Sequence, residues 1–166
     1  FETVQECAVY TLALMNEKES AWGDAYHAFT VYSESYPDGR FADDVHERTA
    51  SVLMRLAREE ITAKKHADAL QKIDLVVNDF SDTAAAQEAE GAKFDLLMGW
   101  GADLRETGNY AKAEALFIQM QANAPSEIAR FAQLELAQTY LAWGLDMGTQ
   151  KNFAEAKIKF DLAAST

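Results

Sequence analysis

Two Asp-x-x-His pairs, Asp24 with His27 and Asp43 with His46, are the side chains in the sequence whose types and spacing best suit chemistry. On a helix, residues three positions apart share a face, so each pair would present a carboxylate beside an imidazole. Four-helix bundles that bind two metal ions use this spacing, but with glutamate, and they add a glutamate from each of two further helices. The sequence therefore leaves a helical metal-binding enzyme as an alternative, although solvated surface pairs are the simpler interpretation.

No other pattern predicts catalysis or a cofactor. Cys7 has no histidine near it in the sequence, and a lone helical cysteine is more often a small buried hydrophobic residue. His66 falls in a repeating row of ring side chains, which favours a position in the core. The sequence has no Gly-x-Gly-x-x-Gly segment, no phosphate-binding loop and no cysteine pair for zinc. We therefore expect no catalytic residue, no metal and no cofactor, and a protein that is not an enzyme.

Composition narrows the class of partner. The 166 residues carry 27 acidic and 15 basic side chains, for a net charge of −12. This balance opposes binding to nucleic acid and to anionic membrane surfaces. No apolar run approaches the roughly 18–20 residues that span a bilayer, so we expect no insertion into a membrane. The sequence opens on Phe1 rather than Met, and we interpret it as a processed or trimmed piece of a longer chain.

The elements that would position these side chains follow from an internal repeat. Alanine recurs at Ala25, Ala69, Ala113 and Ala156, at spacings of 44, 44 and 43 residues. The same spacing relates five further rows: Phe29, Ile73, Phe117 and Phe160; Trp22, His66, Tyr110 and Phe153; Val9, Leu53, Leu97 and Tyr140; Leu12, Leu56, Trp100 and Trp143; Ala13, Ala57, Gly101 and Gly144. Rows of small residues allow helices to cross closely. We predict one domain over 1–166, built of helical hairpins at about 1–37, 38–81, 82–125 and 126–166.

The third repeat shows how each hairpin should be built. Its second helix is predicted over about 110–124, because Ala113 and Phe117 have helical spacing, and Gly108 suits the turn before it. Short polar side chains that suit helix N-caps lie at the expected starts of the first helices of repeats two to four: Asp38, Asp82 and Ser126.

These rows resemble the tetratricopeptide repeat. The matching residues are clearest in the third and fourth repeats: Leu97, Trp100, Gly101, Gly108, Tyr110, Ala113, Phe117, Pro125, Tyr140, Trp143, Gly144, Phe153, Ala156 and Phe160. The resemblance implies an all-α fold, an α-α superhelix or solenoid of about four hairpins. The family repeat has 34 residues, so the surplus here predicts first helices that are longer by two to three turns. The junction "SYPDGRFADD" is also similar to junctions in bacterial cell-envelope repeat proteins, of the Tol-Pal-associated coordinator and outer-membrane assembly lipoprotein types.

In this family the first helices line a concave groove. Carried over by position, the groove-facing residues are Tyr10, Leu14, Met54, Arg55, Arg58, Met98, Leu141 and Leu145. Relatives that clamp a C-terminal carboxylate place Lys, Asn and Arg at inner positions where this chain has mostly apolar side chains, so that ligand is not expected. An amphipathic helix or an extended apolar peptide is the natural guest.

The resulting prediction is a non-enzymatic scaffold that binds a peptide or helix of a protein partner in its groove. The resemblance places it in a periplasmic or cell-envelope complex, with a cytoplasmic location as the alternative. A second hypothesis is a structural segment of a longer repeat protein that self-associates, forming a homo-oligomer through its terminal repeats. Solenoids expose an apolar end unless something caps it, and both ends of this sequence are apolar.

Overall fold

A computed structural model describes residues 2–166, with side chains from residue 3 onward, and every regular element in this part is an α-helix. Phe1 lies outside the described residues. The helices are α1 (Glu2–Lys18), α2 (Trp22–Ser35), α3 (Ala42–Thr62), α4 (His66–Asp79), α5 (Ala84–Glu106), α6 (Tyr110–Asn123), α7 (Ser126–Thr149) and α8 (Phe153–Ser165). The all-α class and the order of four helical hairpins are confirmed. The predicted lengthening of the first helices is also seen, since α3, α5 and α7 have 21, 23 and 24 residues against 14 in α2, α4 and α6.

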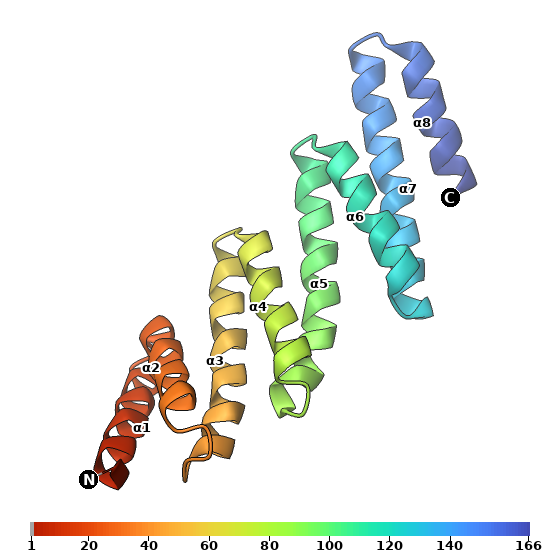
Figure 1. Ribbon diagram of the computed structural model, residues 1–166. Coiled ribbons are helices and arrows are strands. Elements are labelled where there is room, and N and C mark those ends of the chain that lie inside the picture. The colour runs from red at the N-terminus through yellow and green to blue at the C-terminus, as the bar shows by residue number, and fades with distance from the viewer. Residues whose placement is uncertain (1) are drawn as a thin grey trace. The chain divides into compact units, whose positions relative to one another are not determined.

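Helices that follow one another in the chain pack together (Figure 1). The pairs α1–α2, α3–α4 and α7–α8 form antiparallel hairpins, and α2–α3 and α6–α7 join one hairpin to the next. The chain divides into two compact units, 1–93 and 94–166, with the boundary inside α5. No helix among the described residues combines the length and the apolar character needed to cross a membrane.

The turns inside the hairpins reproduce the repeat spacing. Ser20, Lys64, Gly108 and Lys151 each have a positive φ, between 59° and 75°. Each is followed by a backbone hydrogen bond that reaches back five residues, as from Asn109 N–H to the carbonyl of Leu104 at 2.8 Å. This pattern is the Schellman ending of a helix, in which a left-handed residue lets the chain reverse. Three turns adopt it with a residue other than glycine, so the backbone repeat is more regular than the sequence at this position.

Small residues mark the closest helix crossings, as predicted. All four alanines of the repeat row are buried. A Cβ added to Gly101 would lie 2.6 Å from Cε1 of Phe117, and one added to Gly144 would lie 2.7 Å from Cε1 of Phe160. Two of the large rings in the apolar row therefore pack directly against glycine, which explains why the row of small residues contains no larger side chain.

The predicted N-caps are wrong. Helix α3 begins at Ala42, four residues after Asp38, and α7 begins at Ser126 itself; neither has a side-chain cap. Before α5 the capping bond comes from Thr83, whose hydroxyl accepts from the Ala86 N–H at 3.3 Å, and Asp82 instead pairs with a histidine. A turn separates Asp38 from α3, whereas Ser126 already lies inside α7, and the sequence pattern revealed neither offset.

Candidate functional site

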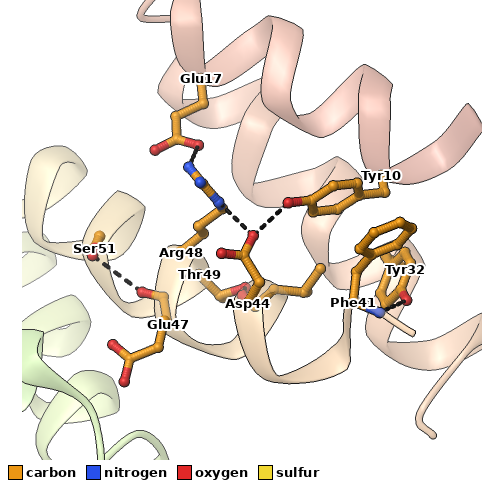
Figure 2. A network of polar contacts seen from close by, with 10 residues as sticks. Tyr10, Glu17, Tyr32, Phe41, Asp44, Glu47, Arg48, Thr49 and Ser51 are labelled. Atoms are coloured by element: carbon orange, nitrogen blue, oxygen red, sulfur yellow. Dashed lines mark hydrogen bonds and ion pairs between the residues drawn. The ribbon is translucent and has the colours of Figure 1, made fainter. Parts of the chain in front are cut away.

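The first unit has its densest polar network where α1 meets α3. The Tyr10 hydroxyl donates to Oδ2 of Asp44 at 2.6 Å, and Arg48 donates from Nε to the same oxygen at 2.6 Å (Figure 2). Nη1 of Arg48 reaches Oε2 of Glu17 at 2.8 Å. The Tyr10 ring also stacks on Phe41, with centroids 4.1 Å apart. These contacts join residues that are 31 to 34 positions apart in the sequence. They hold the start of α3 against the first hairpin.

A second, more buried network holds the turn between α2 and α3. Oε1 of Glu6 accepts from the Tyr32 hydroxyl and from the Arg40 N–H, both at 2.6 Å. The same tyrosine oxygen accepts from the Phe41 N–H at 2.9 Å. Gly39 lies so close that an added Cβ would be 2.7 Å from Glu6 Oε1, so this turn requires glycine. Together these contacts give the "DGRF" segment a single conformation.

The electrostatics of the network favour structure over proton transfer. Burial, followed by the hydrogen bond to Asp44, raises the pKa of Tyr10 and keeps its phenol protonated. Burial acts against the ionised form of Asp44, but bonds from Tyr10 and Arg48 outweigh it and lower the pKa of that carboxyl. Arg48 is likewise desolvated, yet its bonds to Asp44 and Glu17 raise its pKa. None of these shifts brings a pKa closer to neutral pH, where the pKa of an effective general acid or base lies.

The structure places the five predicted groove residues of the first unit in unlike surroundings. Tyr10 belongs to the network above, and Leu14 packs on the core of the first hairpin. Met54 is buried. Arg55 lies over the Trp22 ring, 5.9 Å from its centroid, and Arg58 donates to Glu88 at 3.3 Å. These side chains already have partners within the unit.

The predicted groove residues of the second unit are more accessible. Met98 is half-buried, whereas Leu141 and Leu145 on α7 are 49% and 58% exposed. The two leucines lie one helical turn apart, so they share a face. Phe131 and Leu134, nearer the start of α7, are also exposed. The assignment of all eight residues to a groove stays a prediction, and α7 offers its most open part.

A polar and aromatic cluster joins α6, α7 and α8. The Tyr140 hydroxyl donates to Glu114 at 2.8 Å, and Lys159 lies 4.0 Å from the same carboxylate. Nζ of Lys159 is 3.4 Å from the centroid of the Trp143 ring, a cation–π contact, and Tyr110 stacks on that ring from the other helix. Burial, then the bond to Glu114, raises the pKa of Tyr140 to about 12. Through this cluster α6, the second helix of its hairpin, packs on the following hairpin.

The two Asp-x-x-His pairs do not converge. His46 pairs with Asp82 at 2.8 Å and packs on the Phe80 ring. Asp24 and His27 instead lie at the rim of a groove of about 300 Å³ between α1 and α2. Among the described residues no group of three or more His, Cys, Asp or Glu side chains is placed to hold a metal ion.

Sequence reasoning missed the ion pairs between successive first helices. Besides Glu17–Arg48, the second unit has Arg105 and Glu135, whose Nη1 and Oε2 atoms are 2.5 Å apart. The partners are 30 and 31 residues apart, so no local spacing connects them. The repeat register was the signal that could have revealed these ion pairs, because it aligns Glu17 with Arg105 and Arg48 with Glu135.

Comparisons with known proteins do not assign the chain to a family. No protein-family model and no curated protein matches the chain. The helical repeat is observed directly in the helix order and the turns. The tetratricopeptide resemblance stays a prediction that depends on the sequence rows.

Proposed function

We propose that this chain is a non-enzymatic protein-interaction module of the tetratricopeptide type, which binds an apolar helix or peptide along its first helices. The observation that carries the proposal is the exposed pair Leu141 and Leu145 on α7, at positions that the resemblance assigns to the groove. Apolar side chains repeated at helical spacing and left in water favour a partner with a matching apolar stripe.

Charge supports a partner of limited acidity. The chain has a net charge of −12, which disfavours strongly acidic guests. Arg55 and Arg58 on α3 are exposed, so an acid on the guest could reach Arg55 directly and would compete with Glu88 for Arg58. A micromolar interaction needs about 8 kcal/mol of net binding free energy, so the contacts along the stripe must also offset the loss of translational and rotational freedom.

The test is selection from a displayed library of amphipathic helical peptides, followed by fluorescence anisotropy with purified protein. We expect selected peptides to lose at least tenfold in affinity when Leu141 and Leu145 are both changed to Glu. Ile118→Glu is the matched control, since Ile118 is 47% exposed on α6, which is not one of the first helices, and an acid stands at the equivalent position, Asp161. Unchanged affinity in the double variant, with circular dichroism showing the same helix content, would refute the groove.

The similarity of the "SYPDGRFADD" junction supports a place for this module in a bacterial cell-envelope complex. Fractionation of the native cells tests this part separately from binding. Recovery in the periplasmic or membrane fraction supports it, and recovery only in the cytoplasm refutes it.

A further inference from the structure

The groove between α1 and α2 has an occupied counterpart elsewhere in the same chain. It is lined by Val9, Leu12, Asn16, Asp24, His27, Ala28 and Val31. Three of these, Val9, Leu12 and Ala28, are the repeat equivalents of Tyr140, Trp143 and Lys159. Those last three are the residues that α6 contacts on the final hairpin. The groove on the first hairpin is therefore the surface that, three repeats further along the chain, a second helix already covers.

The helix at the other end of the chain presents the complementary surface. On α6, Tyr110 stacks on Trp143 and Glu114 bonds to Tyr140. Their equivalents on α8 are Phe153, which is 70% exposed, and Lys157, which is also exposed. Phe153 thus stands where a ring is used for docking, but nothing among the described residues covers it.

The apolar row shows the same difference between α8 and the other second helices among the described residues. Phe29, Ile73 and Phe117 are fully buried, whereas Phe160 in the same row is 37% exposed. On the receiving hairpin, Leu12 is 54% exposed. If the two faces met, each would bury apolar surface that is now exposed to water. This burial is the main driving force for association.

Charge selects which faces meet. Residues 1–37 carry six acidic side chains and one basic, whereas residues 150–166 carry two acidic and three basic. Two first hairpins would therefore repel each other, and two α8 helices would gain nothing. A first hairpin and an α8 helix attract, and Lys157, which pairs with Asp161 at 3.0 Å on its own helix, brings its positive charge to a groove lined in part by Asp24.

We infer that α8 of a second copy of this chain docks in the groove between α1 and α2, in the manner in which α6 docks on the final hairpin. The contact is heterologous, since the two copies use different surfaces. In register, Phe153 of one copy lies on Leu12 of the other, and Lys157 lies over Val9 and Ala28, near Asp24.

Sedimentation velocity of the purified full chain tests this with two variants that each disable one face. Leu12→Glu blocks the groove and leaves α8 intact; Phe153→Glu blocks α8 and leaves the groove intact. We expect wild type to self-associate with rising concentration, each variant alone to stay monomeric, and an equimolar mixture of the two to form a 1:1 dimer. Both positions are exposed, so folding should be retained, and circular dichroism checks it.

Leu134→Glu is the control, because residue 134 and its equivalents at 3, 47 and 91 are all exposed, and it should associate like wild type. Adding Lys157→Glu to the Leu12→Glu copy should weaken the mixed dimer about fivefold, as expected for one rim charge.

Three results would each overturn the inference: a wild type that remains monomeric at the highest soluble concentration, association of Leu12→Glu by itself, or a mixture of folded variants that does not dimerise. Peptide binding at Leu141 and Leu145 can be measured in the monomeric Phe153→Glu variant. Failure of self-association and failure of the proposed groove are therefore observed separately.

Discussion

The ion pair Glu17–Arg48 in the first unit and the pair Arg105–Glu135 in the second occupy the same position of the repeat with opposite polarity. Glu17 follows Val9 by eight residues, as Arg105 follows Leu97; Arg48 and Glu135 each precede the next member of that row by five. In the first unit the acid lies on the earlier helix, and in the second the base does. At this position of the repeat the geometry thus admits a bridge of either polarity.

The two bridges also differ in burial and support. The side chains of Arg105 and Glu135 are 17% and 21% exposed, against 36% and 24% for Arg48 and Glu17. Arg48 has a second acid, Asp44, which Tyr10 also holds. Loss of one partner should therefore lower the free energy of unfolding more in the second unit. There the remaining charge is less exposed to water and has fewer other groups to pair with.

The largest expected effect comes from Arg105→Met. It leaves Glu135 largely buried without its cation, and we expect a loss of about 2–3 kcal/mol in the free energy of unfolding. Arg48→Met should cost about 1 kcal/mol, because its pair is more exposed and Asp44 keeps its bond from Tyr10. Urea unfolding followed by circular dichroism measures both; equal losses would show that burial does not distinguish the two bridges.

The exchanged double variant Arg105→Glu with Glu135→Arg sharpens the same comparison. It gives the second unit the polarity of the first, and we expect its stability to lie within about 1 kcal/mol of wild type. A loss as large as that of Arg105→Met would mean that polarity is fixed by surroundings and not free to vary.

A smaller effect is expected at alkaline pH, at Tyr140 of the second unit. The pKa of Tyr140 is raised to about 12 in the folded protein, so its neutral phenol contributes stability that is complete below pH about 10. This contribution, about 1–2 kcal/mol, is lost as pH rises through about 10 to 12. Wild type and Tyr140→Phe should therefore converge in stability over that range in urea titrations, relative to their difference at pH about 8. A constant difference would contradict the raised pKa.

In the first unit the pKa values of Tyr10 and Tyr32 are also raised by burial and by hydrogen bonds to carboxylates, and Asp44 adds a titration at the acidic end. The pKa of Asp44 is lowered, so its contribution is present above the ordinary pKa near 4 and is lost as pH falls through the lower folded value. The tyrosines and the aspartate thus set stability limits at opposite ends of the pH scale.

The smallest effect concerns salt. Glu17→Gln should destabilise by about 0.5 kcal/mol in dilute buffer, since the pair is partly exposed. In about 1 M salt, where the screening length is roughly 3 Å, the difference from wild type should shrink. Thermal unfolding at two salt concentrations measures it, and an undiminished effect would indicate that the bridge is more deeply desolvated than its exposure implies.

The sequence was sufficient to predict the four hairpins, since one alanine row and its companions determine the register, and Gly108 lies at the predicted turn. It was insufficient for the N-caps, because a turn separates Asp38 from Ala42 and no residue pattern marks its length. The environments of the groove residues were also beyond reach. Met54 and Leu141 have the same repeat position, yet one is buried and the other exposed, because burial depends on neighbours from other helices.

The reversed polarity of the two bridges has a consequence for how the chain folds. Similar hairpins in one chain can pair in the wrong order, and such misassembly is a characteristic failure of repeat proteins. If α1 met α7 in place of α3, Glu17 would face Glu135; if α5 met α3 in place of α7, Arg105 would face Arg48. Each wrong pairing brings like charges together at a desolvated position, whereas each native pairing does not. The reversed polarity therefore disfavours these two mispairings, because each would desolvate two like charges.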